Sequence, residues 1–458
     1  MLNLDTLNIK VKKAQYAVRG PIVELAQELE MQGREIYYFN IGNPQQLGQA
    51  PLTYAREVLS LVNNPALLAR PSVLAEFASD NVQRANEIMK HNPIGLGAYS
   101  QSAGMPFIRQ AVADFIHERD NIPTNWRNVF LTDGASKGVD LVLNSLIRDE
   151  KDGVMIPIPQ YPLYSADIAL FGGTPVPYYL DEDNEWRLSE ENLEETYAKA
   201  GKDGVNVRCL VVINPSNPTG ALLSKENIKM VVEFAAKHDL AIIADEVYQE
   251  NIYNPEDSFH SFAKVGHEQG SKSPIFSLHS TSKGFIGECG YRGGYIEMRN
   301  VDPAVQLEML KLRSIGLCAN TPGQIMTYLM VRPPKEGEES HELYTQERAS
   351  ILGALARKAR SISTGLDKLD GVHCPTPRGA MYLFPRLELP EKDYGGKPAD
   401  FVFCKTLVEE EGIVTVPGSG FGQLPGTWHL RMTFLPPEDK VPEILERFER
   451  CYYKFVGR

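Results

Sequence analysis

Residues 275–284 have the sequence IFSLHSTSKG, a short apolar run that ends in hydroxyl groups and a lysine, Lys283. A run of this length is typical of a buried β-strand. Two similar apolar runs occur at residues 209–213 and 240–244, and helical patterns lie between several such runs. The alternation predicts an α/β fold with a mostly parallel central sheet flanked by helices.

Polar side chains follow each of these three runs. The first run leads into NPSNPTG, the second into DEVY, and the third into STSK. Ligands of parallel sheets lie beyond the carboxyl ends of the strands, so we expect the three segments to share one site. Asn217 precedes Asp245 by 28 positions, and Asp245 precedes Lys283 by 38. A lysine at a strand end, near a carboxylate, suits Schiff-base chemistry on pyridoxal phosphate.

Taken singly, these segments have simpler interpretations. Asn-Pro-Thr-Gly is a good turn sequence, and Asp245 could cap a helix. Ser280-x-x-Lys283 is also the first element of a class of serine acyl-enzymes, and Ser79-Asp80-Asn81 resembles its second element. That class has the two elements in the reverse order, and the sequence has no Lys-Thr-Gly, so this alternative is the weaker one.

Composition limits the classes of function. The 458 residues include 47 basic and 59 acidic side chains, a net charge of −12, which argues against a nucleic-acid coat protein. The sequence has no long apolar run. Its six dispersed cysteines show no metal-ligand spacing and predict free thiols and no metal site. The N-terminal residues lack the apolar core of a signal peptide, so we expect a soluble cytoplasmic protein.

The patterns divide the chain into three parts. We expect an N-terminal segment over residues 1–51, which packs on a small domain or a partner subunit. A large cofactor-binding domain is expected over 52–330, and a smaller α+β domain over 331–458. The last part begins with a long helical pattern over 346–369 and continues with strand-like pieces near 380–384 and 413–416. A final helix is expected from about Pro437.

One helix start is suited to binding an anion. Residues 139, 142, 143 and 146 are apolar at helical spacing, and Asp133-Gly134-Ala135-Ser136 precedes them. A glycine turn that opens a helix presents free backbone N–H groups.

Four longer motifs carry a resemblance to a known family. They are STSKGFIGECGYRGGY (280–295), NPIGLGAYS (92–100), PQYPLY (159–164) and HLRMTFLPP (429–437). With these motifs the chain resembles the fold type I, aspartate-aminotransferase-like pyridoxal phosphate enzymes, and most of all their alanine aminotransferase branch. The resemblance extends over essentially the whole chain.

The resemblance implies roles for the residues at the strand ends. Lys283 would form the Schiff base with the cofactor and shuttle the proton of the substrate. Asp245 would pair with the pyridine nitrogen and keep it protonated. Asn217 and Tyr248 match the hydrogen-bond partners of the ring 3′-oxygen. Tyr161 occupies the ring-stacking position, where aspartate aminotransferases have a tryptophan; without its motif it would be an ordinary core aromatic.

The resemblance also implies a phosphate site. Ala135, Ser136 and Lys137 would offer backbone N–H groups, Ser280 a hydroxyl and Arg292 a guanidinium. Lys283 and Arg292 are nine residues apart, one more than in aspartate aminotransferases, and this fits the alanine branch.

Three further positions concern the partner subunit and the substrate. Tyr99 matches the tyrosine that reaches the phosphate from the other subunit, which would require a homodimer; alternatively, it packs locally. Arg431 would bind the substrate α-carboxylate in a bidentate pair. Gly42 matches a segment that closes over that carboxylate, or is a simple turn glycine. Arg19, a speculative contact for the distal carboxylate of glutamate, is left outside the expected site.

The resemblance therefore implies a pyridoxal-phosphate aminotransferase that exchanges an amino group between L-alanine and 2-oxoglutarate by a ping-pong mechanism. Glyoxylate is an alternative acceptor within the same branch, and an aromatic or kynurenine aminotransferase is a more distant alternative. Relatives on the same scaffold perform β-elimination or cyclisation. A ligand-sensing regulator would need an added DNA-binding segment, and the chain has no spare basic domain.

Overall fold

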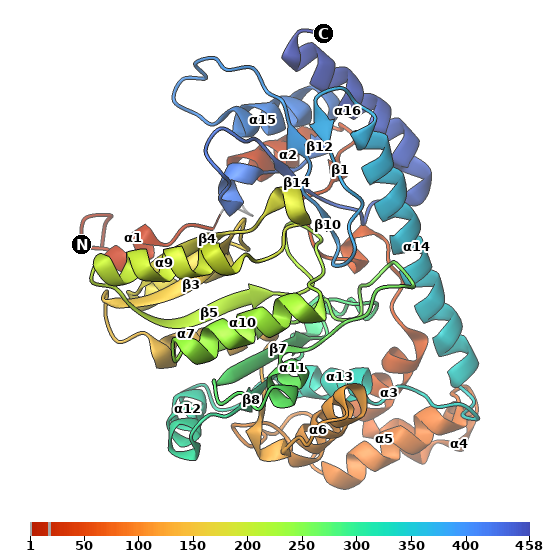
Figure 1. Cartoon of the computed structure of the whole chain (residues 1–458). Coiled ribbons are helices and arrows are strands. Elements are labelled where there is room, and N and C mark those ends of the chain that lie inside the picture. The colour runs from red at the N-terminus through yellow and green to blue at the C-terminus, as the bar shows by residue number, and fades with distance from the viewer. Residues whose placement is uncertain (1, 17–19) are drawn as a thin grey trace.

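The computed structural model describes residues 2–16 and 20–458. Its centre is a seven-stranded sheet with the order β2-β8-β7-β6-β5-β3-β4 (Figure 1). Only β8 runs antiparallel to its neighbours, so six strands share one direction. The strands are β2 (Val129–Leu131), β3 (Asp152–Ile158), β4 (Thr174–Tyr179), β5 (Asn206–Ile213), β6 (Ala241–Asp245), β7 (Ile275–Ser280) and β8 (Gly294–Arg299). The mostly parallel α/β sheet expected from the sequence is confirmed.

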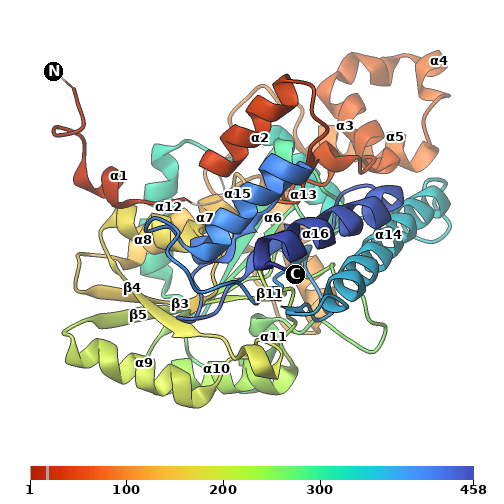
Figure 2. The ribbon, with the colours of Figure 1, turned by 90° about the horizontal axis from the view of Figure 1, so that it is seen from above.

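Helices cover both faces of this sheet (Figure 2). One face carries α7 (Ala135–Leu146), α8 (Leu163–Phe171) and α12 (Pro303–Ile315), and the other α9 (Glu190–Lys202), α10 (Lys225–Lys237) and α11 (Phe262–Glu268). Side chains alternate between the faces: Val211 packs on the α7 side, whereas Leu210 and Val212 pack on the α10 side. Burial on both faces explains why β5 is continuously apolar.

A helical layer lies beside the β2 edge of the sheet. It consists of α3 (Thr53–Asn63), the short α4 (Pro71–Leu74), α5 (Ser79–His91), α6 (Pro106–Asp120) and α13 (Thr321–Val331). These helices share one apolar cluster with Val129 and Leu131 of β2 and with Tyr295 of β8. The cluster also contains Phe285 and Ile286, so it packs against the segment that follows β7.

The small domain combines segments from the N-terminal and C-terminal parts of the chain in one core. Its helices are α2 (Pro21–Met31), α15 (Ala399–Glu411), α16 (Val441–Val456) and the second half of α14 (His341–Asp367). Its strands are β1 (Tyr37–Tyr38), β9 (Val372–His373), β10 (Tyr382–Leu383), β11 (Arg386–Leu387), β12 (Ile413–Val414), β13 (Val416–Pro417) and β14 (Leu430–Thr433). A smaller α+β domain built from the C-terminal part and the N-terminal segment is thus confirmed; the boundaries at 51/52 and 330/331 remain predictions.

Helix α14 connects the two units, as Figure 1 shows along one side of the molecule. Tyr344, near its start, packs in the helical layer, whereas Leu355 and Ile362 pack in the core of the small domain. Among the described residues, no helix is both long enough and apolar enough to cross a membrane.

Candidate functional site

A pocket of about 740 Å³ lies where the carboxyl ends of β5, β6 and β7 meet the small domain. Every strand-end residue expected in the site lines this pocket. The predicted residues along it are Gly42, Ala135, Ser136, Tyr161, Asn217, Asp245, Tyr248, Ser280, Lys283, Arg292 and Arg431. Lys137 and Tyr99 are not among its lining residues, and Arg19 lies outside the described residues.

Asp245, the last residue of β6, is buried in the pocket wall. Tyr164 of α8 donates a hydrogen bond of 2.8 Å to its Oδ2 atom. The other oxygen, Oδ1, is buried and has no hydrogen-bond partner among the described residues. Burial raises the pKa of Asp245, and the Tyr164 hydrogen bond, the backbone N–H of Val247 and the charge of Lys283 oppose that rise. The carboxylate can therefore accept one further donor from the pocket.

Lys283 follows β7 and projects into the same space. Its Nζ atom donates to the backbone oxygen of Gly42 over 2.7 Å and lies 5.8 Å from the centre of the Tyr248 ring. A Cβ atom added at Gly42 would lie 2.5 Å from the Tyr382 hydroxyl and 3.1 Å from Lys283 Nζ. A side chain at position 42 would collide with these two groups of the pocket. A glycine needed only for a turn would not have to lie so close to them.

Arg431 of β14 reaches the pocket from the small domain. Its Nη1 atom donates to Asn217 Oδ1 over 3.3 Å, and Nη2 donates to the Asn40 backbone oxygen over 2.6 Å. The guanidinium carbon lies 4.7 Å from the centre of the Tyr382 ring and 4.8 Å from that of Phe421. Only 2% of the residue is exposed, and among the described residues no acidic side chain forms an ion pair with it. The buried cation is thus available for an anionic ligand.

The opposite end of the pocket begins at α7. Gly134 precedes this helix with a φ of +76°, and an added Cβ would lie 2.4 Å from Arg292 Nη2. Arg292 Nη2 donates to the backbone oxygen of Asp133 over 3.2 Å and lies 3.5 Å from Ser136 Oγ. A guanidinium and the free N–H groups of a helix start therefore face the same space, which suits a phosphate.

Ser280 belongs to the same end of the pocket. It is 3% exposed, and its hydroxyl can donate either to Ser282 Oγ, 3.0 Å away, or to the Gly293 backbone oxygen, 3.1 Å away. Lys283 bonds to Gly42 rather than to Ser280. Ser79-Asp80-Asn81 opens α5 and does not line the pocket. The arrangement a serine acyl-enzyme would need is therefore absent among the described residues.

Tyr161 lines the pocket together with Tyr16 of the N-terminal segment. Its hydroxyl is 2.7 Å from the hydroxyl of Tyr16, and the two rings meet edge to face at 6.2 Å. The short helix α1 (Ile9–Lys13) anchors this segment, because Lys10 Nζ donates to the backbone oxygen of Phe171 over 3.2 Å.

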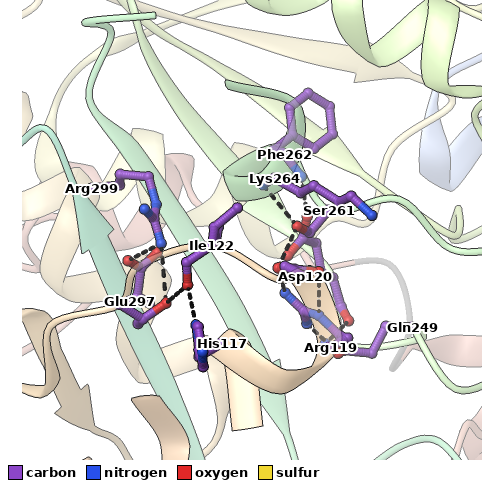
Figure 3. Close-up of polar contacts among 12 residues, drawn as sticks. His117, Arg119, Asp120, Ile122, Gln249, Ser261, Phe262, Lys264, Glu297 and Arg299 are labelled. Atoms are coloured by element: carbon purple, nitrogen blue, oxygen red, sulfur yellow. Dashed lines mark hydrogen bonds and ion pairs between the residues drawn. The ribbon is translucent and has the colours of Figure 1, made fainter. Parts of the chain in front are cut away.

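A buried polar network supports the segment that follows Asp245. Figure 3 shows Arg119, at the end of α6, between Asp120 and Gln249, and Asp120 accepts a hydrogen bond of 2.7 Å from Ser261. Ser261 in turn caps α11 by accepting from Lys264 N. The network joins α6, α11 and the loop after β6, and so restrains the loop that carries Tyr248.

Tyr99 lies on the surface. It is 78% exposed, as is Ile94, and Ile315 is 80% exposed. The 92–100 loop packs on residues 319–324, since Thr321 Oγ1 donates to Leu96 O and Gln324 Nε2 donates to Ser100 Oγ. Asn320 beside them contacts both Asp133 and Arg292. The loop that carries the exposed Ile94 and Tyr99 therefore lies beside the end of the pocket that Arg292 lines.

Sequence reasoning missed two buried tyrosines of the site. Tyr164 binds Asp245, and Tyr382 lies 2.9 Å from Tyr248, hydroxyl to hydroxyl. Tyr164 stands in the PQYPLY motif, three positions after Tyr161, so helical spacing was a signal for it. Nothing in the sequence near Tyr382 indicates that a strand of the small domain reaches the large one.

Comparison with known proteins gives consistent results. The family "Aminotransferase class I and II" matches residues 63–448. Alanine aminotransferase 1, mitochondrial, of Arabidopsis thaliana is 47% identical over 99% of this chain and 87% of its own length. Glutamate–glyoxylate aminotransferase 1 of the same plant is 47% identical over 99% and 96%. Human alanine aminotransferase 1 is 44% identical over 100% and 95%. A solved structure of an alanine aminotransferase from Pyrococcus furiosus superposes with a TM-score of 0.80 at 24% identity, over 98% of this chain and 100% of that one.

The chain therefore belongs to the class I and II aminotransferases. It is a transaminase that depends on pyridoxal phosphate, and its substrates are amino acids and oxo acids. No group of three potential metal-ligating side chains exists within residues 2–16 and 20–458.

Proposed function

We propose that this transaminase exchanges an amino group between L-alanine and 2-oxoglutarate, giving pyruvate and L-glutamate. The observation that carries the proposal is the 44–47% identity, over nearly the whole chain, to plant and animal proteins named alanine aminotransferase. A second candidate is the glutamate–glyoxylate exchange, because a relative of that name is equally similar.

The pocket residues fit pyridoxal phosphate. Asp245 would hold the ring nitrogen, and its buried, unpartnered Oδ1 atom supports this role. Tyr161 lines the same pocket, and this position supports a stacking role for its ring. Tyr248 and Asn217 would bind the ring oxygen from the side of β5 and β6.

The phosphate would lie at the start of α7. The backbone N–H groups of Ala135, Ser136 and Lys137, the Ser280 hydroxyl and the Arg292 guanidinium would hold it. The absence of space for a Cβ atom at Gly134, next to Arg292 Nη2, supports this placement.

The reaction would then depend on two charged side chains. Pyridoxal phosphate, when bound, supplies a ring that accepts electrons and stores the amino group between the two half-reactions. Lys283 would take the proton from the Cα atom of the amino acid in the first half-reaction. In the second half-reaction it would give a proton to the Cα atom of the amino acid that forms. Arg431 would bind the α-carboxylate through both Nη atoms, and Gly42 would close over it. The hydrogen bond of 2.7 Å from Lys283 Nζ to Gly42 O supports the view that both residues face the same bound substrate.

We further propose a homodimer in which Tyr99 reaches the partner's phosphate site. The exposed Ile94, Tyr99 and Ile315 near the phosphate end support this assembly, because side chains of this size are costly to leave in water. The division of the chain at 51/52 and 330/331 and a cytoplasmic location also remain proposals. Six free cysteines agree with a reducing compartment, although some relatives carry mitochondrial names.

Absorbance of the purified, cofactor-loaded protein tests the substrates. L-alanine should shift the visible band, and 2-oxoglutarate should restore it; a band that L-glutamate but not L-alanine shifts, and that glyoxylate restores, would favour the second candidate. Lys283→Ala should lose both half-reactions about equally, by at least ~100-fold. The control is Lys311→Ala on the exposed face of α12. A band that alanine leaves unmoved while another amino acid shifts it would overturn alanine as the donor. Pyruvate release from cysteine without an oxo acid would indicate a lyase.

A further inference from the structure

Tyr382 is a buried tyrosine of the pocket to which the proposed function gives no role. It lies on β10, which pairs with β14, so the small domain carries it. Its ring stands at 87° to the ring of Tyr248, with the centres 5.7 Å apart, and the two hydroxyl oxygens are 2.9 Å apart. The contact joins the small domain to the loop after β6.

The two charged side chains near Tyr382 are both cations. Lys283 and Arg431 are the charged side chains that act on it, and Tyr248, Tyr161 and Cys289 are the other titratable groups nearby. Burial alone would raise the pKa of Tyr382, but the two cations and the hydrogen bond with Tyr248 together lower it. Burial raises the pKa of Tyr248, and the contact with Tyr382 raises it further. An oxygen in this position is a good acceptor when Tyr248 donates to it.

The direction of the hydrogen bond between Tyr248 and Tyr382 should change when the cofactor is bound. A phenol has one proton to donate. If Tyr248 gives its proton to the ring oxygen of the cofactor, it can no longer donate to Tyr382. The 2.9 Å contact then persists only if Tyr382 becomes the donor. Gly42 leaves the room that the Tyr382 hydroxyl occupies, because a Cβ atom at position 42 would lie 2.5 Å from it.

We propose that Tyr382 is a positioning residue whose hydroxyl donates to Tyr248 and thereby orients and polarises the Tyr248 hydroxyl toward the ring oxygen of pyridoxal phosphate. Two hydrogen bonds in a chain strengthen each other. The inference rests on the proposed function, because it requires the ring oxygen to lie beside Tyr248. It also links the small domain to the electronic state of the cofactor through a single side chain.

The test replaces Tyr382 by phenylalanine, which keeps the ring over Arg431 and removes only the hydroxyl. The readout is the pH midpoint of the visible absorption change of the loaded protein without substrate. Losing a donor near the ring oxygen should raise that midpoint by roughly 0.5 pH units and weaken cofactor binding by about fivefold. Tyr452→Phe is the matched control, because Tyr452 is a buried tyrosine of the same core whose hydroxyl bonds to Gly371 O at 2.9 Å, away from the pocket.

A double variant separates an effect through Tyr248 from a direct one. In Tyr248→Phe protein, Tyr382→Phe should no longer shift the midpoint, because the hydroxyl it acts through is gone. An equal shift in both backgrounds would overturn the inference, as would a Tyr382→Phe midpoint identical to that of Tyr452→Phe. If the wild-type protein shows no band that depends on Lys283, the proposed site fails instead. A normal wild-type titration with an unmoved Tyr382→Phe midpoint contradicts only the role of Tyr382.

Discussion

Arg431 is held at both Nη atoms by partners that lie far apart in the sequence, Asn217 and Asn40. Lysine carries the charge but not the planar fork, so it cannot span both partners and a carboxylate at once. We expect Arg431→Lys to raise KM for the amino acid and for the oxo acid by roughly 100-fold each. Steady-state kinetics on both substrates measure this, with urea unfolding to monitor stability.

The matched control is Arg447→Lys in α16. The Arg447 guanidinium lies 5.2 Å from the Tyr37 ring centre and bonds to the Glu411 backbone, well away from the pocket. It should lose some stability and leave both KM values unchanged. Arg431→Lys with wild-type KM for both substrates would contradict carboxylate binding by this residue.

Individual site residues were predictable when they directly follow an apolar run. Asp245 does so, Asn217 and Lys283 lie within five residues of such a run, and parallel strands bring their ends to one edge. Tyr382 was not predictable, because its importance comes from a contact 134 positions away across two domains. Short-range patterns contain no information on such a contact.

The start of α7 depends on one glycine. Gly134 has a φ of +76°, and an alanine Cβ would displace the Arg292 guanidinium, the flexible group nearest to it. Gly134→Ala should cost roughly 1–2 kcal/mol of folding free energy and weaken cofactor binding at least tenfold. Cofactor titration followed by absorbance measures the affinity.

Gly201→Ala in α9 is the comparison, because an added Cβ there has no neighbour within 4 Å. Alanine inside a helix should raise stability by about 0.5–1 kcal/mol and leave the cofactor affinity unchanged. Equal affinities in the two variants would show that the α7 start does not hold the phosphate.

The junction of β6 and α11 predicts a pH effect. Glu246 follows Asp245, accepts a hydrogen bond of 2.8 Å from Phe262 N, and has its pKa raised to about 8 by burial, against the opposing charge of Arg119. Between its ordinary value of 4.5 and about 8, the folded chain keeps a proton that the unfolded chain releases. The free energy of unfolding should therefore fall as pH rises through this window.

Glu246→Gln removes this titrating group while its amide oxygen can still accept from Phe262. The decline of unfolding free energy between pH 5 and 8 should become shallower in this variant. Glu195→Gln, on the exposed face of α9, should keep the wild-type slope. A Glu246→Gln slope equal to the wild-type one would contradict the burial argument. Urea unfolding at several pH values measures all three.

Element types were easier to predict than element ends. The strand expected over residues 209–213 is longer, because β5 (Asn206–Ile213) also pairs with β3 through Asn206 and Val207. The last helix begins at Val441 rather than near Pro437, after a short 3₁₀ turn at Glu438–Lys440. The long helix begins at His341 rather than at 346, because Tyr344 is drawn into the helical layer. Tertiary packing decides such ends.

At the scale of the whole molecule, the proposed dimer can be tested because each active site would contain residues of both subunits. Tyr99→Ala and Lys283→Ala should each inactivate the site in which the changed residue acts. Hybrid dimers of the two variants would contain one intact site, so mixing after dissociation should restore activity to roughly a quarter of wild type.

The control mixes two preparations of Lys283→Ala, which should remain inactive. If the mixture of Tyr99→Ala and Lys283→Ala gains nothing although hybrids form, Tyr99 acts within its own subunit. Size-exclusion chromatography with a tagged variant establishes that hybrids are present.

The pairing of β1 with β12 affects the order in which the protein can form on the ribosome. All seven strands of the central sheet have been made once Arg299 is released. Tyr37, by contrast, was made among the first residues, yet it pairs with Ile413, and α2 beside it packs on α15. Strand β1 must therefore wait, unpaired, until Ile413 has been made, and the pocket, which needs both Gly42 and Arg431, can close only after synthesis is almost finished.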